Sequence, residues 1–409
     1  MHVVYIHQHF STRKGATGTR SYEMAQCLID AGHKVSMVTG VSEATMNVFK
    51  TTNRVEKIDI DGIDVYCISE PYSNKMGFWR RVRAFQRFAN KSAEVATATG
   101  ADLVFATSTP LTVGIPGMKA ARRLKAPFVF EVRDLWPEMP IAMGIIRNPL
   151  IKWYTRRMER NIYAAASRMI ALSPGMVEGV VKVGFPAEKI AMIPNSCDLD
   201  LFRPDPTPLD DARFGPPGDF RLVFTGAHGK ANGLDAVLDA AAELVRRGEK
   251  GIRFCFIGQG SERDRLVQRS KDEGSDRMIS WQTFVPKEEL ARILPRMDAG
   301  MMILANHPGF YYGTSPNKFF DYISCGIPVL NNYPGWVAGM LEKHRCGVVV
   351  PPGDAKAFAD ACVWMRDHRG ECEAMGPRGR ALAEAEFDRK RLGGEFVKWL
   401  EAAYEESRR

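Results

Sequence analysis

Long apolar runs are missing from this chain, and no stretch approaches the roughly 20 residues that a membrane-spanning helix needs. The 8 cysteines include no C-x-x-C pair, and the 8 histidines form no ligand-spaced cluster. This scatter argues against a disulfide framework and favours a reducing cytosol. Residues 1–10 lack a charged segment followed by an apolar core, so we interpret them as a first strand and not as a signal peptide.

Two domains are expected, because 409 residues exceed the size of one ordinary domain. The net charge of +8 and the pI near 9.0 favour anionic partners, such as nucleotides, phospholipid or nucleic acid. The basic residues are dispersed and match no nucleic-acid-binding signature, so we expect no nucleic acid partner.

Short apolar, β-branched runs alternate with helical patterns along the chain. They lie at 3–7, 34–39, 102–106, 127–132, 168–172 and 190–193, and then at 222–225, 252–257, 278–285, 300–304, 328–331 and 347–350. Such alternation predicts parallel sheets with crossover helices. We therefore predict an α/β protein with two Rossmann-like, doubly wound domains that face each other across a cleft.

A Pro-rich segment at Leu201–Gly218 separates the two series of strands and has the composition of a linker. The expected domains are residues 1–202 and residues 203–386. Residues 387–409 form a charged helix that could pack on either domain.

The stretch from Gly313 to Val329 predicts a loop, a short helix, a turn and a strand. Ser315 or Thr314 can cap the helix, and Gly326 is its natural end.

Asn317 and Lys318 fall in the first turn of this helix, where backbone N–H groups attract anions, and Asp321 follows one turn later. The N–H groups and Lys318 would bind phosphate, while Asp321 would bind ribose hydroxyls. A solvated amphipathic helix explains the same pattern equally well.

Gly-rich loops follow predicted strands at three places. Gly15 and Ala16 lie after the first strand and before Arg20, which could meet a phosphate. The loop from Gly226 to Gly233 contains a lysine and would cradle a diphosphate. Its candidate ligand residues are Gly226, Gly229, Lys230 and Asn232, with Gly258 after the next strand. Structural turns are the alternative interpretation.

Charged residues gather where the strand at 127–132 ends, namely Glu131, Arg133, Asp134 and Glu138. Charged residues at a strand end favour a functional site, because a buried charged side chain needs a partner. A structural Arg–carboxylate network remains the alternative. Two D-x-D strings, at 59–61 and 198–200, are interpreted as structural, and we expect no metal.

Two helical patterns are amphipathic and basic. Residues 78–91 place Phe78, Val82, Phe85 and Ala89 on one face and Arg/Lys on the other, with no acid from 75 to 91. We expect this segment, Phe78–Lys91, to contact an anionic membrane surface. Residues 149–166 carry a similar stripe, and we expect that one to face the core.

The chain resembles glycosyltransferase family 4, the retaining GT-B enzymes, and within it the bacterial branch typified by the probable L-fucosamine transferase of O-antigen synthesis. The resemblance spans nearly the whole chain. It rests on the stretches at 15–20, 133–138, 193–198, 226–233, 315–322 and 326–329.

The resemblance implies that the second domain holds a nucleotide sugar, that the first holds the acceptor, and that the final helix crosses back to the first domain. Asp321 matches the second Glu of the family's E-x7-E motif, whereas Gly313 stands where the first Glu would contact the donor sugar. The phosphate loop of the family usually carries an Arg and a Lys. In this chain the pair is reduced to Lys230.

The implied mechanism is a front-face transfer that needs no metal or other cofactor. Lys230, Lys318, helix N-termini and the Gly15 loop would stabilise the leaving diphosphate, whose own oxygen accepts the acceptor's proton. Arg133 and Asp134 would act at the reacting centre, with Asp134 orienting the acceptor or the sugar. Glu131 and Glu138 would lie on the acceptor side.

The expected function is transfer from a UDP-sugar, with an N-acetylated amino sugar as one candidate, to a lipid-linked or polysaccharide acceptor in cell-surface polysaccharide synthesis. The enzyme would be cytoplasmic and peripherally bound to the inner face of the cytoplasmic membrane. The alternatives are a GT-B-fold UDP-sugar epimerase and a non-enzymatic protein that binds anions or membranes.

Overall fold

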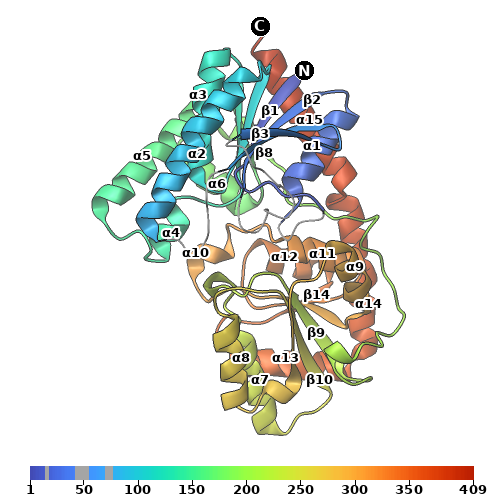
Figure 1. Ribbon diagram of the computed structural model, residues 1–409. Helices are drawn as coiled ribbons and strands as arrows, with labels where there is room; N and C mark the ends of the chain where they lie inside the picture. Colours follow the sequence, from blue (N-terminus) through green and yellow to red (C-terminus); the bar gives the residue numbers. More distant parts are fainter. Residues whose placement is uncertain (14–17, 42–54, 70–76) are drawn as a thin grey trace. The chain divides into compact units, whose positions relative to one another are not determined.

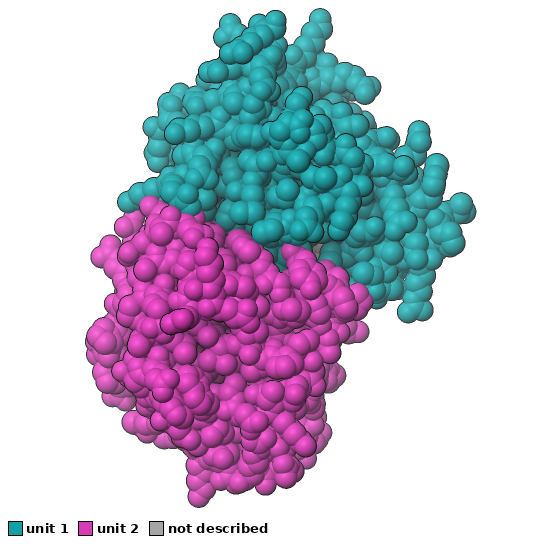
Figure 2. Space-filling view, turned by 180° about the vertical axis from the view of Figure 1, so that it is seen from behind, with its two compact units in different colours: residues 1–194, 313–315, 390–409 teal, residues 195–312, 316–389 magenta. Residues whose placement is uncertain are grey.

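The computed structural model describes residues 1–13, 18–41, 55–69 and 77–409. The chain divides into two compact units, shown in separate colours in Figure 2. Unit 1 contains residues 1–194, 313–315 and 390–409, and unit 2 contains residues 195–312 and 316–389. The chain therefore enters unit 2 a few residues before the boundary we expected at 202. The Pro-rich segment packs within unit 2, where Phe202 and Phe214 are fully buried.

Unit 1 is built on an eight-stranded sheet with the order β3-β4-β2-β1-β5-β6-β7-β8. Its strands are β1 His2–Ile6, β2 Lys34–Gly40, β3 Val55–Ile60, β4 Ile63–Ile68, β5 Leu103–Thr107, β6 Phe128–Val132, β7 Arg168–Ala171 and β8 Ile190–Met192. All neighbours pair in parallel except the hairpin β3–β4, which contains the first D-x-D string.

Helices cover the sheet of unit 1 (Figure 1). They are α1 Arg20–Asp30, α2 Phe78–Ala98, α3 Gly114–Leu124, α4 Glu138–Ala142, α5 Pro149–Ala165, α6 Pro174–Lys182 and the final helix α15 Arg389–Glu406. The core lies between these helices and the strands β1, β5 and β6, whose residues are almost all buried.

Unit 2 has a six-stranded, wholly parallel sheet with the order β11-β10-β9-β12-β13-β14. The strands are β9 Phe220–Thr225, β10 Ile252–Ile257, β11 Ile279–Gln282, β12 Ala299–Met302, β13 Val329–Asn331 and β14 Gly347–Val349. The helices are α7 Asp235–Arg247, α8 Arg263–Asp272, α9 Lys287–Ile293, α10 Pro308–Tyr311, α11 Asn317–Cys325, α12 Trp336–His344, α13 Ala355–Asp367 and α14 Arg369–Glu386. Both sheets confirm the predicted two-domain α/β fold.

The final helix α15 packs on unit 1. Leu392, Phe396 and Leu400 are buried, and the Phe396 ring meets the Phe105 ring edge-on at 5.1 Å. The indole Nε1–H of Trp399 donates to the Met169 carbonyl oxygen at 3.0 Å. A helix with one apolar face and a charged outer face is stable only when that apolar face is covered, and here unit 1 covers it.

Each of the two amphipathic basic helices is buried over part of its length. In α2, Phe88 and Ala89 are buried in the core of unit 1, so this part of the apolar face is not available to a membrane. In α5, the stripe that we expected in the core is exposed at its amino-terminal end, at Leu150 and Tyr154, and buried at Ile162, with Met158 packed against the core. Among the described residues, no helix is long and apolar enough to cross a bilayer.

Candidate functional site

Two glycine loops meet at the carboxyl ends of β9 and β10. Gly226 has φ +124° and Gly258 has φ +152°, conformations that side chains with a Cβ rarely adopt. A Cβ on Gly258 would collide with the Gly226 carbonyl oxygen, and one on Gly260 would collide with the His228 backbone. The glycines that we predicted as ligand contacts therefore also let the two loops pack backbone to backbone.

The helix α11 begins beside these loops. Our prediction of a Ser315 or Thr314 cap is wrong, because the helix begins at Asn317, with Pro316 at the N-cap and no side-chain cap. The exposed Asn317 and the half-buried Lys318 occupy the first turn. Such a turn leaves backbone N–H groups for water or an anion. Gly326 ends the helix at φ +68°, as predicted.

Lys318 lies against the end of β9. Its Nζ is 4.7 Å from the centre of the Phe224 ring, and its Cε would lie 3.5 Å from a Cβ placed on Gly226. Burial lowers the pKa of Lys318 to about 8, although the Asp321 carboxylate acts in the opposite direction. An anion bound beside Lys318 would therefore stabilise the charged form of its side chain.

Asp321 follows one turn later, and it is half-buried. Burial raises its pKa to about 6, while Lys287 and Arg389 lower it and Asp198 raises it. Asp198 itself forms ion pairs with Lys287, at 3.5 Å, and with Arg389. The second D-x-D string is thus tied to cationic side chains of unit 2.

Tyr322, which our sequence reasoning missed, fixes α11 on the sheet. Its hydroxyl accepts from the Thr225 N–H at 3.1 Å and donates to the Val223 carbonyl oxygen at 3.2 Å. A Cβ on Gly300 would collide with the Tyr322 ring, so the glycine inside β12 makes room for it. That strand glycine was the available signal.

The remaining residues of the predicted phosphate loop have different surroundings. Lys230 is exposed at the start of a short 3₁₀ turn, Lys230–Asn232. The Asn232 side chain donates to the Ala227 carbonyl oxygen at 2.7 Å, so it stabilises the loop from within. Gly229 is half-buried, and a Cβ added to it would meet open space. Of the two lysines, Lys318 is the one whose ammonium group is held at the end of β9.

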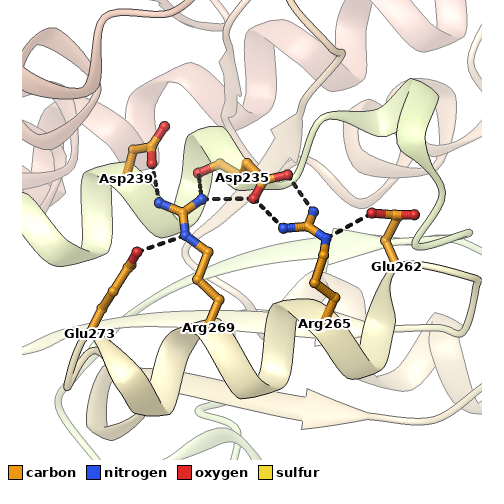
Figure 3. Close-up of polar contacts among 6 residues, drawn as sticks. All are labelled: Asp235, Asp239, Glu262, Arg265, Arg269 and Glu273. Atoms are coloured by element: carbon orange, nitrogen blue, oxygen red, sulfur yellow. Dashed lines mark hydrogen bonds and ion pairs between the residues drawn. The ribbon is translucent and has the colours of Figure 1, made fainter.

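Two arginines of α8 join it to α7 on the flank of this region (Figure 3). Arg265 pairs with Asp235 at 2.6 Å and with Glu262 at 2.9 Å. Arg269 pairs with Asp235 at 2.7 Å, with Glu273 at 2.7 Å and with Asp239. Single exposed pairs contribute little, but this shared network holds together the two helices that follow the glycine loops.

In unit 1, Arg20 and Glu131 form a buried ion pair at 2.7 Å, with 3% and 0% of their side chains exposed. Arg20 also donates to the carbonyl oxygens of Ile193 and Pro194, and Glu131 accepts from the Thr107 hydroxyl at 2.6 Å. Our predictions of Arg20 as a phosphate contact and of Glu131 as an acceptor contact are not supported. The two side chains bind one another inside the protein.

Arg133 and Asp134 lie at the carboxyl end of β6, as predicted. The Arg133 Nη1 is 3.4 Å from the His7 Nε2, and the Arg133 N–H donates to the Ser108 hydroxyl at 2.9 Å. Desolvation raises the pKa of Asp134 to about 6, although Arg133 lowers it and the residue retains an exposed surface. Asp134 and Glu138 are thus the two acids of the predicted cluster that solvent reaches.

Two histidines that follow β1 were also missed. Burial and the Arg133 charge hold the pKa of His7 well below its usual value and lower the pKa of His9 to about 4. Both are therefore neutral near pH 7 and can accept or donate hydrogen bonds without carrying charge. Their position directly after the first strand was the signal.

The other predicted residues of unit 1 lie in different surroundings. Glu138 is exposed and pairs with Arg156 at 3.2 Å, an ordinary surface contact. Gly15 and Ala16 lie outside the described residues. Ser315, with Gly313, groups with unit 1 and is half-buried. Among the described residues, no three His, Cys, Asp or Glu side chains gather as metal ligands.

Comparison with known families matches both halves of the chain. Residues 15–196 match the model of the glycosyl transferase 4-like domain, and residues 219–368 match glycosyl transferases group 1. Together the two models cover most of both units.

Curated relatives are distant in sequence. The chain is 22% identical to the colanic acid biosynthesis glycosyltransferase WcaL of Escherichia coli strain K12, over 64% of this chain and 63% of that one. It is 24% identical to the amylovoran biosynthesis glycosyltransferase AmsK of Erwinia amylovora, over 56% of this chain and 54% of that one. The matches thus span between half and two thirds of these relatives.

Solved structures share the whole fold. Sucrose-phosphate synthase from Thermosynechococcus elongatus superposes with a TM-score of 0.76 at 18% identity, covering 98% of this chain and 99% of that one. Anabaena HepE, solved in complex with UDP, gives a TM-score of 0.72 at 15% identity, covering 98% and 100%. With a mixed sheet in unit 1, a parallel sheet in unit 2 and two matching domain families, the chain is a glycosyltransferase with the GT-B fold, built from a glycosyl transferase 4-like domain followed by a group 1 domain.

Proposed function

We propose that this protein is a retaining, metal-independent glycosyltransferase that takes a sugar from a UDP-sugar and adds it to a lipid-linked or polysaccharide acceptor. The observation that carries the proposal is the placement of Lys318 and Asp321 on the uncapped first turns of α11, beside the Gly226 loop. These groups supply one cation, a helix N-terminus without a side-chain cap and one carboxylate within a few residues.

The donor would bind with its diphosphate on Lys318 and the α11 N-terminus. Gly226 and Gly229 leave the backbone accessible to phosphate oxygens, because no side chain covers them. Asp321 would accept hydrogen bonds from the ribose hydroxyls. Anabaena HepE, which shares the fold, has been solved with UDP and with UDP-glucose, and this favours uridine. Relatives named as GDP-mannose-dependent make GDP the competing nucleotide.

The chemistry would consist of stabilising a leaving diphosphate with fixed positive potential. Lys318 and the α11 N–H groups are already oriented by Phe224 and Tyr322, so little reorganisation accompanies the reaction. Lys230, exposed and on a short turn, can swing towards the same group. Asp134, held beside Arg133, would orient the acceptor or the sugar.

The proposed acceptor and location of the enzyme draw on its relatives. WcaL and AmsK are named for the biosynthesis of colanic acid and of amylovoran, and these names support a role in polysaccharide synthesis. We therefore propose a lipid-linked glycan acceptor and a peripheral position on the inner face of the cytoplasmic membrane. The link to an L-fucosamine donor, and to O-antigen, remains a hypothesis from the sequence resemblance.

Calorimetric titration with UDP and GDP tests the donor site. We expect saturable UDP binding that is weakened both in Lys318→Gln and in Asp321→Asn. Preference for GDP would change the base assignment, and no binding of either nucleotide would contradict the site. Incubation with UDP-sugars in the absence of acceptor would reveal an epimerase, because such an enzyme converts the sugar nucleotide by itself.

A further inference from the structure

An exposed apolar patch lies where α4 leads into α5, on unit 1. It consists of Met143, Ile145, Leu150, Trp153 and Tyr154, which are 37%, 60%, 76%, 58% and 58% exposed. Leu150, Trp153 and Tyr154 occupy one face of α5, because residues three and four apart are neighbours on a helix. We call these five residues the α5 patch.

The opposite face of α5 explains why this patch is not core. Thr155, Glu159, Ile162 and Tyr163 are the buried residues of the helix. They already attach α5 to unit 1, and in Figure 1 the helix lies on the outer side of that unit. The apolar side chains at the amino-terminal end of α5 are therefore a second apolar surface, which the fold of unit 1 does not need.

The α5 patch lies in a basic stretch of the chain. From 143 to 165 the sequence contains Arg147, Lys152, Arg156, Arg157 and Arg160 but a single acid, Glu159, which is buried. The Arg157 guanidinium lies 5.8 Å from the centre of the Trp153 ring, so one of these cations lies directly beside an aromatic ring of the patch. Of these basic residues, Arg156 forms an ion pair with Glu138.

We propose that the α5 patch inserts into the headgroup region of a bilayer that contains anionic phospholipid. Trp and Tyr prefer the membrane–water interface because their rings have an apolar body and a polar tip. Leu150 and Ile145 would enter the acyl boundary, while the arginines remain at the phosphate level, as long cationic side chains do.

The charge of the patch favours lipid over a second copy of this chain. A symmetric dimer places the same surface on both partners, so it would bring two sets of these arginines together. Phospholipid phosphates neutralise these arginines instead, because an anionic surface attracts basic residues that lie close to it. The proposal moves the membrane contact from α2, where Phe88 is buried, to α5.

Vesicle flotation of the full chain tests this inference. We expect co-flotation with vesicles that contain phosphatidylglycerol, weak flotation with pure phosphatidylcholine, and release as salt rises. The variant Leu150→Ser/Trp153→Ser should lose on the order of tenfold in partitioning, because two inserted side chains are removed. Phe284→Ser, on the exposed Phe284 of unit 2, is the matched control and should float like the parent.

Charge reversal separates the two basic helices. Arg157→Glu/Arg160→Glu should abolish flotation, whereas Arg80→Glu/Arg83→Glu on α2 should leave most of it. The reverse pattern would overturn the proposal in favour of α2. Sedimentation in the absence of lipid must also show no concentration-dependent dimer that Trp153→Ser dissolves, since such a dimer would assign the patch to self-association. UDP binding, measured on the same variants, should be unchanged, which keeps this result separate from the donor site.

Discussion

Lys318 places its ammonium group 4.7 Å from the centre of the Phe224 ring, so the cation of the proposed donor site rests on the last residues of β9. The ring face is electron-rich and holds the cation without neutralising it. An incoming diphosphate would therefore meet a cation that is oriented and still charged.

The pH dependence of nucleotide binding follows from this environment. Burial lowers the pKa of Lys318 to about 8, and a bound phosphate favours the charged form and raises that pKa again. Binding should consequently weaken as the pH rises above 8 and be accompanied by proton uptake near that pH. Titration calorimetry in buffers of different ionisation enthalpy measures the uptake. A Lys318→Gln variant should show no such proton uptake, and identical uptake in both proteins would assign it to another group.

Asp321→Ala should weaken nucleotide binding while the fold persists. A hydrogen bond to a charged group contributes about 1.5–3 kcal/mol, so affinity should fall roughly tenfold to a hundredfold. Calorimetry measures the affinity and circular dichroism checks the fold. Asp272→Ala, at the exposed end of α8, is the control. Wild-type affinity in Asp321→Ala would remove this residue from the site.

Gly258→Ala should destabilise unit 2. The added Cβ would collide with the Gly226 carbonyl oxygen, and alanine is strained at φ +152°. Such strain costs on the order of 1–3 kcal/mol, which urea denaturation can measure. Gly229→Ala is the matched control, since its φ is −110° and no atom lies within 4 Å of the added carbon. Equal stability of the two variants would contradict the close approach of the loops.

Breaking the Arg20–Glu131 pair should cost more than replacing it. Arg20→Met leaves a buried carboxylate without its partner and should lower the free energy of unfolding by about 3–5 kcal/mol. The double variant Arg20→Met/Glu131→Leu should recover much of this loss, because neither charge is then left buried alone. Urea denaturation of the single and double variants gives the comparison. Two additive losses would indicate that the pair is not coupled.

Metal independence and stereochemistry can be tested together. We expect transfer in excess EDTA with retention at the anomeric carbon, because Lys318 and the α11 N-terminus would supply the positive potential at the diphosphate. NMR of the product reports the anomeric configuration. An inverted product, or activity restored only by Mn²⁺ or Mg²⁺, would reject the proposed mechanism.

Local sequence patterns predicted all six strands of unit 2 and six of the eight strands of unit 1, where β3 and β4 were missed. Runs of β-branched residues alternate with helical periods, and this periodicity depends only on residues that are close along the chain. The end of α11 at Gly326 was predicted in the same way. Lys318 and Asp321 were found because their spacing on one short helix is itself local.

Only the tertiary structure decided what the charged and apolar side chains face. Arg20 finds Glu131 a hundred residues away and Ile193 still farther along the chain, so no local pattern could show that its guanidinium is buried. Likewise, the stripe on α5 has the periodicity of a core helix, but unit 1 covers it at Ile162 and leaves it exposed at Leu150 and Tyr154. A helical period reveals that a helix has two faces, and packing selects which of them meets the protein interior.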